Sequence, residues 1–117
     1  GDAVLRRVAR TLVDVARPGD LVGRWGGEEF LVIAPATTKD EAVGLAEACR
    51  VALSATTAPA VGRITASFGV AVHLDDDTAW TLLRRADDAL YQAKAQGRDR
   101  VEIDVADGRE LRASGVA

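Results

Sequence analysis

The feature that most constrains the fold is a pair of apolar runs separated by a short glycine turn. Leu21–Trp25 and Phe30–Ala34 each have the length and composition of a β-strand, and Gly26–Glu29 between them begins with two glycines. Glycine readily adopts the positive φ values that tight hairpin turns need. The sequence therefore predicts a β-hairpin with two carboxylates, Glu28 and Glu29, at its tip.

The remaining elements alternate along the chain. Two stretches, Asp2 to Arg17 and Thr38 to Leu53, have the three-and-four spacing of apolar residues that is typical of a helix with one buried face, and a third of the same kind ends at Gly97. Residues of two different faces alternate over Ile64–His73, which predicts a strand. Arg100–Ile103 is predicted to form a short last strand. The order helix, strand, strand, helix, strand, helix, strand predicts an α/β (α+β) fold in which helices pack on one mixed sheet.

Bulk composition narrows the classes of function. The 117 residues fit one domain, and 48% hydrophobic with 28% charged residues is typical of a folded protein. A net charge of -3 provides no basic field for a nucleic acid polymer. Cys49 is the only cysteine, which excludes an internal disulfide. His73 is the only histidine, which excludes a zinc site built from histidines. With no disulfide possible, a reducing cytoplasm is the expected location, either for a free protein or for the cytoplasmic part of a larger, membrane-attached sensor. No apolar run is long enough to span a membrane, so we expect no membrane contact by this segment.

The hairpin tip can bind a metal ion. Protein-bound Mg²⁺ that carries a nucleotide is held by one or two carboxylates, while phosphates and water supply its other ligands. Glu28 can be one such ligand, and Gly26 and Gly27 let phosphates approach the backbone. Taken alone, the same residues are read more simply as a solvated turn.

Five segments together resemble the GGDEF family. Arg24–Phe30 is similar to the family signature in its GGEEF form. Gly1–Leu5 resembles the end of the GHxxGD segment, Thr65–Val70 the TxSxG strand, Ala86–Lys94 the ADxALYxAK helix, and Gly97–Val101 the GRNRV segment. The order and spacing of these segments match the family over almost the whole chain. This match favours a metal-binding role for the hairpin tip over a simple solvated turn.

The resemblance implies a fold and an activity. Family members are diguanylate cyclases, which join two GTP molecules into cyclic di-GMP and two pyrophosphates on a palm-like, mainly antiparallel sheet flanked by helices. By that similarity Glu28 would hold Mg²⁺, for which Mn²⁺ can substitute, and Glu29 would support the metal or the ribose. Catalysis would require a homodimer, because one subunit holds only half of the reacting atoms.

The same resemblance assigns residues to the substrate. Gly26 and Gly27 would face the phosphates, Asp2 would accept hydrogen bonds from the guanine edge, and Leu5 would wall the base. Lys94 and Arg98 would bind the triphosphate. Read locally, Asp2 is only a helix N-cap, and cations around the helix-ending Gly97 also favour the helix dipole.

Arg17 and Asp20 match the spacing of the family's RxxD inhibitory site, which binds the cyclic product. Arginine can pair with phosphate or stack on guanine, which suits a purine dinucleotide. The same segment is also composed of residues that end a helix in a turn. A further arginine of some members corresponds to Ala48 here, so product affinity is expected to be reduced.

The resemblance also implies elements that would precede Gly1. The family's first strand bears a metal-binding aspartate, and an FKxxND segment follows it. We therefore expect 1–104 to be a GGDEF domain lacking its first strand, 105–117 to be a flexible tail or linker, and this segment alone to be inactive. The rival reading is a non-catalytic cyclic di-GMP receptor or a protein-docking module.

Overall fold

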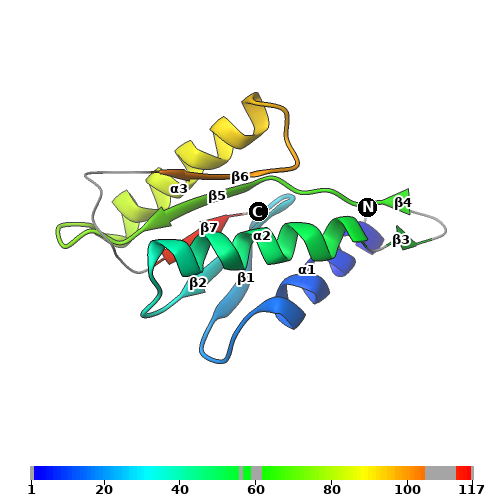
Figure 1. The fold of residues 1–117 in the computed structure, drawn as a ribbon, viewed down its shortest axis with the longest axis horizontal. Coiled ribbons are helices and arrows are strands. Elements are labelled where there is room, and N and C mark those ends of the chain that lie inside the picture. The colour runs from blue at the N-terminus through cyan, green and yellow to red at the C-terminus, as the bar shows by residue number, and fades with distance from the viewer. Residues whose placement is uncertain (1, 56, 59–61, 105–112, 117) are drawn as a thin grey trace.

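A five-stranded sheet forms the centre of the fold (Figure 1). The computed structural model describes residues 2–55, 57–58, 62–104 and 113–116. The strands occur in the order β1-β2-β7-β5-β6. Their bounds are Leu21–Gly26 for β1, Glu29–Ala34 for β2, Phe68–Val72 for β5, Val101–Asp104 for β6 and Ala113–Val116 for β7. A separate two-stranded sheet pairs β3 (Thr57–Ala58) with β4 (Gly62–Arg63).

Helices cover both faces of the large sheet. α1 (Asp2–Val15) and α2 (Lys39–Ala55) share one buried cluster with Phe68 and Val70 of β5. α3 (Ala79–Ala95) packs on the other face, where Ala71 of β5 contacts Ala86 and Leu90. Successive residues of a strand point to opposite faces, so β5 supplies both cores. All five of its residues are buried.

The predicted fold class is confirmed. Strands β1, β2, β7 and β5 pair antiparallel, and only β5 and β6 pair parallel, which gives the mixed and mainly antiparallel sheet expected. The strand predicted over Ile64–His73 is shorter than expected. Pairing with β6 begins at the Phe68–Val101 pair, so the residues before Phe68 have no partner strand in this sheet.

The segment predicted as a tail contains a strand. Ala113–Val116 forms β7, which pairs with β2 on one side and β5 on the other, while 105–112 lie outside the described residues. Sequence patterns did not predict β7, because the small residues of this segment have weak strand preference. Backbone hydrogen bonds on both sides stabilise it where its composition would not.

None of the described helices is long and apolar enough to cross a membrane.

Gly69 allows the closest contact between α3 and the sheet. A Cβ atom placed there would lie 2.3 Å from both the Ala86 carbonyl oxygen and the Leu90 amide nitrogen. Both atoms belong to helix backbone, which cannot rotate away as a flexible side chain can. Gly69 therefore sets the depth at which α3 packs on β5, and with it the position of the α3 C-terminal end.

We expect Gly69→Ala to destabilise the fold by about 2 kcal/mol or more, because a well-packed core cannot accept an added methyl without shifting the helix. Denaturant unfolding followed by circular dichroism measures the loss. The control is Gly44→Ala in α2, where an added Cβ meets nothing within 4 Å and replaces a weak helix former. Equal stability of the Gly69→Ala variant and the wild type would contradict the close contact.

Candidate functional site

A cleft of about 300 Å³ brings together five of the residues predicted to act on the substrate. Its walls come from the start of α1, the hairpin tip, the segment before β5 and the end of α3. The predicted residues in its lining are Leu5, Glu28, Glu29, Lys94 and Arg98, and Val4, Val8, Phe30, Ile64, Thr65, Ala66 and Ser67 complete it. The cleft is therefore apolar at the α1 side and charged between the hairpin and α3.

The hairpin tip is a two-residue turn. Gly26 pairs with Glu29, so Gly27 and Glu28 form the turn itself. Gly27 has φ 50°, a value that side chains other than glycine seldom adopt. Arg24 fixes the turn from the side by donating to the Gly27 carbonyl oxygen from Nε at 3.0 Å and from Nη2 at 2.6 Å. Glu28 is thereby held at the exposed tip, with its side chain in the cleft lining.

An ion pair spans the cleft. Lys94 Nζ lies 3.7 Å from Glu29 Oε2, and both side chains are more than a third exposed. Burial raises the pKa of the nearby Asp87 carboxyl, repulsion from Glu29 and Asp88 raises it further, and Lys94 partly offsets this. Lys94 is therefore attracted to carboxylates from both the hairpin and its own helix.

The end of α3 positions Arg98, the second cation of the cleft. Arg98 donates its backbone N–H to the Ala93 carbonyl oxygen at 2.9 Å, directly after Gly97, which has φ 125°. This is the usual way in which a glycine ends a helix. Lys94 consequently enters the cleft from the last turn of α3, and Arg98 from the residue after Gly97.

The donor set at the tip fits a nucleotide-carried Mg²⁺ and does not fit a metal held by protein alone. No group of three or more His, Cys, Asp or Glu residues that could hold a metal is present among the described residues. Glu28 and Glu29 offer two carboxylates in a solvent-open cleft, which matches the one or two protein ligands of such an ion. A divalent cation bound there would depend on phosphate oxygens for further ligands.

Three further residues were predicted to contact the substrate. Gly26 and Gly27 lie at the hairpin tip and are absent from the described cleft lining. Asp2 is the first residue of α1, and its side chain lies outside the described part of the structure. Ser67 also lies in the cleft wall, although its spacing alone did not predict a role there, and its hydroxyl accepts a hydrogen bond from the Asp99 amide at 3.2 Å.

Arg17 and Asp20 form a separate, preformed unit. Asp20 is 3% exposed, and its Oδ2 accepts from the Arg17 backbone N–H at 2.8 Å and from Arg17 Nε at 3.2 Å. Arg17 Nη2 also donates to the buried Thr37 hydroxyl at 2.6 Å. The Arg17 side chain stays 40% exposed, so the arginine, and not the aspartate, is presented to solvent. The predicted Ala48 lies exposed on α2.

This unit is distant from the cleft. Arg17 and Asp20 precede β1, and the hairpin turn follows it, so the two sites lie at opposite ends of a strand of six residues. At about 3.3 Å per residue the separation is roughly 20 Å.

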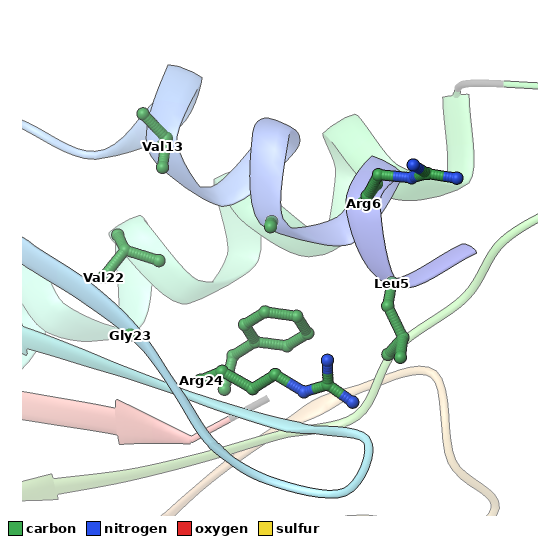
Figure 2. A pocket seen from close by; sticks show the side chains of 8 residues that line it. Leu5, Arg6, Val13, Val22, Gly23 and Arg24 are labelled. Carbon is green, nitrogen blue, oxygen red and sulfur yellow. The ribbon is translucent and has the colours of Figure 1, made fainter. Parts of the chain in front are cut away.

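A second groove of about 490 Å³ adjoins the cleft between α1 and β1. Its lining consists of Leu5, Arg6, Ala9, Val13, Val22, Gly23, Arg24 and Phe30. Figure 2 shows Val13 and Val22 at one end of it and Leu5, Arg6 and Arg24 at the other. Leu5 and Phe30 line both the groove and the cleft, so the two cavities form neighbouring parts of one concave surface.

The residues without an assigned role remain outside the cleft lining. Cys49 is 2% exposed, and burial raises the pKa of its thiol to about 11, which makes it an inert core residue. His73 is half-buried directly after β5. Trp25 and Trp80 are 50% and 79% exposed, although tryptophan is usually highly buried, and nothing in the structure explains their exposure.

Comparison with known proteins agrees with the geometry. The sequence model of a family described as diguanylate cyclase, GGDEF domain, matches residues 1–100. The chain is 50% identical over 101 residues to diguanylate cyclase DgcM of Escherichia coli K12, covering 86% of this chain and 25% of that protein.

Two solved structures are similar in fold. The GGDEF domain of DgcB from Caulobacter crescentus in complex with c-di-GMP has a TM-score of 0.83 at 34% identity, over 88% of this chain and 64% of that one. The active GGEEF domain of a diguanylate cyclase from Vibrio cholerae has a TM-score of 0.82 at 33% identity, over 90% and 69%. The chain thus spans about a quarter of DgcM and about two thirds of either crystallised chain.

An ion pair between Asp77 and Arg85 fixes the start of α3, and it makes stability depend on pH. Burial works to raise the pKa of Asp77, but hydrogen bonds from Leu74, Thr81 and Arg85 outweigh it and hold the pKa below its ordinary value. A carboxyl with a depressed pKa stabilises the fold above its unfolded pKa, near 3.9, and the contribution is lost as the pH falls through the folded value.

We expect Asp77→Asn to lower stability at pH 7 and to reduce the loss of stability on acidification below about pH 4. Urea unfolding at a series of pH values measures both effects. Asp75→Asn, in the same exposed turn, is the control and should change neither. Parallel stability curves for wild type and Asp77→Asn would contradict the assignment.

Proposed function

Because the chain belongs to the GGDEF family of diguanylate cyclase domains, we propose that it supplies the GTP-binding cleft of a diguanylate cyclase. The observation that carries the proposal is the cleft in which the two hairpin carboxylates face Lys94 and Arg98. Carboxylates on one side and cations on the other are what a metal-carried triphosphate requires. An isolated solvated turn would not need the opposing cations.

GTP binds in a definite direction. Lys94 and Arg98 bind the β- and γ-phosphates, and Glu28 with Glu29 faces the metal ion that the phosphates carry. The apolar wall at Leu5 lies toward the base, and Asp2 reads the guanine edge. Mg²⁺, or Mn²⁺ in its place, neutralises phosphate charge when it is bound.

Binding of the substrate requires the Glu29–Lys94 ion pair to open. Exposed pairs of this kind contribute little to stability, with a typical value of about 0 to 1 kcal/mol. Phosphate can therefore replace Glu29 as the partner of Lys94, which frees the Glu29 carboxylate for the incoming cation. In this exchange Lys94 turns from Glu29 to phosphate and Glu29 turns from Lys94 to the cation, while the backbone stays in place.

The reaction needs two subunits. The 3′-hydroxyl oxygen of each GTP attacks the α-phosphorus of the other, the bond from that phosphorus to the β-phosphate oxygen breaks, and pyrophosphate leaves. The hydroxyl protons pass to solvent. Two such steps close the ring of cyclic di-GMP, and a homodimer with facing clefts brings the two substrates together.

Arg17 binds the cyclic product as an inhibitor. Its guanidinium is held by Asp20 and Thr37 and keeps one side open, which suits stacking on guanine or pairing with phosphate. Asp20, being 3% exposed, orients Arg17 more than it contacts ligand. With Ala48 where some members have arginine, we expect weak product inhibition.

Residues 1–117 on their own are inactive under this proposal. The two carboxylates of the hairpin are fewer than the set that the family resemblance implies, since its first strand adds an aspartate. The rival, a receptor that binds cyclic di-GMP without making it, would use the same Arg17 unit and differs in needing no metal.

In the complete protein, we expect Glu28→Gln to lower the rate of cyclic di-GMP formation from GTP and Mg²⁺ by about 100-fold or more, since even outer-shell changes at metal sites cost 10- to 100-fold. Chromatography of the nucleotides measures it. Asp76→Asn, an exposed carboxylate remote from the cleft, is the matched control. Tight binding of added cyclic di-GMP with no synthesis by the wild type would favour the receptor and overturn the cyclase.

A further inference from the structure

Three consecutive residues with positive φ follow α3. The φ angles are 125° at Gly97, 62° at Arg98 and 47° at Asp99. Glycine adopts such angles freely, aspartate less often and arginine seldom. A backbone in this region persists only where its surroundings hold it, and such residues cluster at functional sites.

Asp99 makes contacts that add to those of the Arg98 backbone itself, whose N–H donates to Ala93 and whose carbonyl oxygen accepts from Arg100 Nε. Its amide donates to the Ser67 hydroxyl at 3.2 Å, and its Oδ1 lies 3.0 Å from Arg50 Nη1. Ser67 is 8% exposed and belongs to the wall of the cleft. Asp99 is thus tied by its backbone to the segment before β5 and by its side chain to α2.

Arg50 is itself fixed. Its Nε donates to both carboxylate oxygens of Glu47, at 3.1 Å and 3.0 Å, and its Nη2 lies 2.5 Å from Glu47 Oε1. Only Nη1 reaches Asp99. The side chain of Arg50 is 22% exposed, so it forms a partly buried, bidentate anchor on α2.

We propose that Arg50 and Asp99 are positioning residues for Arg98. They hold the backbone at Arg98 in its left-handed conformation, and this conformation directs the Arg98 side chain into the phosphate end of the cleft. Neither residue is among those that line the cleft. The inference rests on the proposed function, because it assumes that Arg98 binds the triphosphate of GTP.

The chain offers a matched control. Arg63 Nη2 lies 4.0 Å from the other oxygen of the same Asp99 carboxylate, and its side chain is 64% exposed. An exposed pair at that distance adds little. Arg50 and Arg63 therefore both approach the Asp99 carboxylate, but only Arg50 is also held by Glu47.

The test compares Arg50→Met with Arg63→Met in the 117-residue chain. Methionine keeps an apolar stem and removes the charge. Titration of each variant with Mg²⁺-GTP and with GMP, followed by NMR, measures both affinities. GMP lacks the β- and γ-phosphates, so it does not report on Arg98. We expect Arg50→Met to weaken GTP binding about tenfold and to leave GMP binding unchanged, and Arg63→Met to change either by less than about twofold.

Several outcomes would overturn the inference. An equal loss of GTP and GMP affinity in Arg50→Met would mean that Arg50 supports the fold alone, and unchanged GTP affinity would mean that Arg50 has no role. If Arg50→Met does not fold, Asp99→Asn, which removes the carboxylate charge that Arg50 contacts, must weaken GTP binding selectively. Coupling constants that report φ at Arg98 and Asp99 must change in the variant with weakened binding. A wild-type chain that binds neither nucleotide fails at the proposed function, and the inference falls with it.

Discussion

Backbone pairing across the middle of the sheet determines whether the cleft exists. β2 carries Glu29 at its first residue, and β5 begins directly after Ser67 in the opposite wall. These two strands do not pair with each other, because β7 lies between them and pairs with both. Neighbouring strands lie about 4.8 Å apart, so one intervening strand separates β2 from β5 by roughly 10 Å. That spacing leaves room for a ligand between the hairpin tip and the end of α3.

The charged side of the cleft is built from parts with different rigidity. Gly69 lets α3 contact the sheet backbone, and the Asp77–Arg85 pair fixes the start of the same helix. The backbone that bears Lys94 and Arg98 is therefore firmly placed. The Glu29–Lys94 pair is more than one third exposed on both sides and is easily exchanged. A rigid frame with exchangeable side-chain contacts would suit the proposed binding and release of a multiply charged nucleotide.

Periodicity and turn residues were sufficient to predict the three helices, the hairpin and the mixed sheet, because each of these depends on local patterns. The five cleft residues were found through motif resemblance, since nothing local distinguishes Lys94 or Arg98 from ordinary cations at a helix end. β7 was missed because its small residues carry no strand pattern, and its pairing comes from distant strands. The roles of Ser67, Thr37 and Arg50 also depend on contacts between segments far apart in the chain, which no spacing rule reveals.

The central claim is that one metal-carried triphosphate lies between the hairpin carboxylates and the end of α3. Paramagnetic line broadening by Mn²⁺ tests it most directly, with NMR spectra of the labelled chain recorded with Mn²⁺ alone and with Mn²⁺ and GTP together. The account predicts that GTP is needed for selective broadening of amide signals at Glu28 and Glu29, and that the Arg98 signal broadens with them. Broadening confined to the acidic turn at 75–77, or the same pattern with and without GTP, would contradict it.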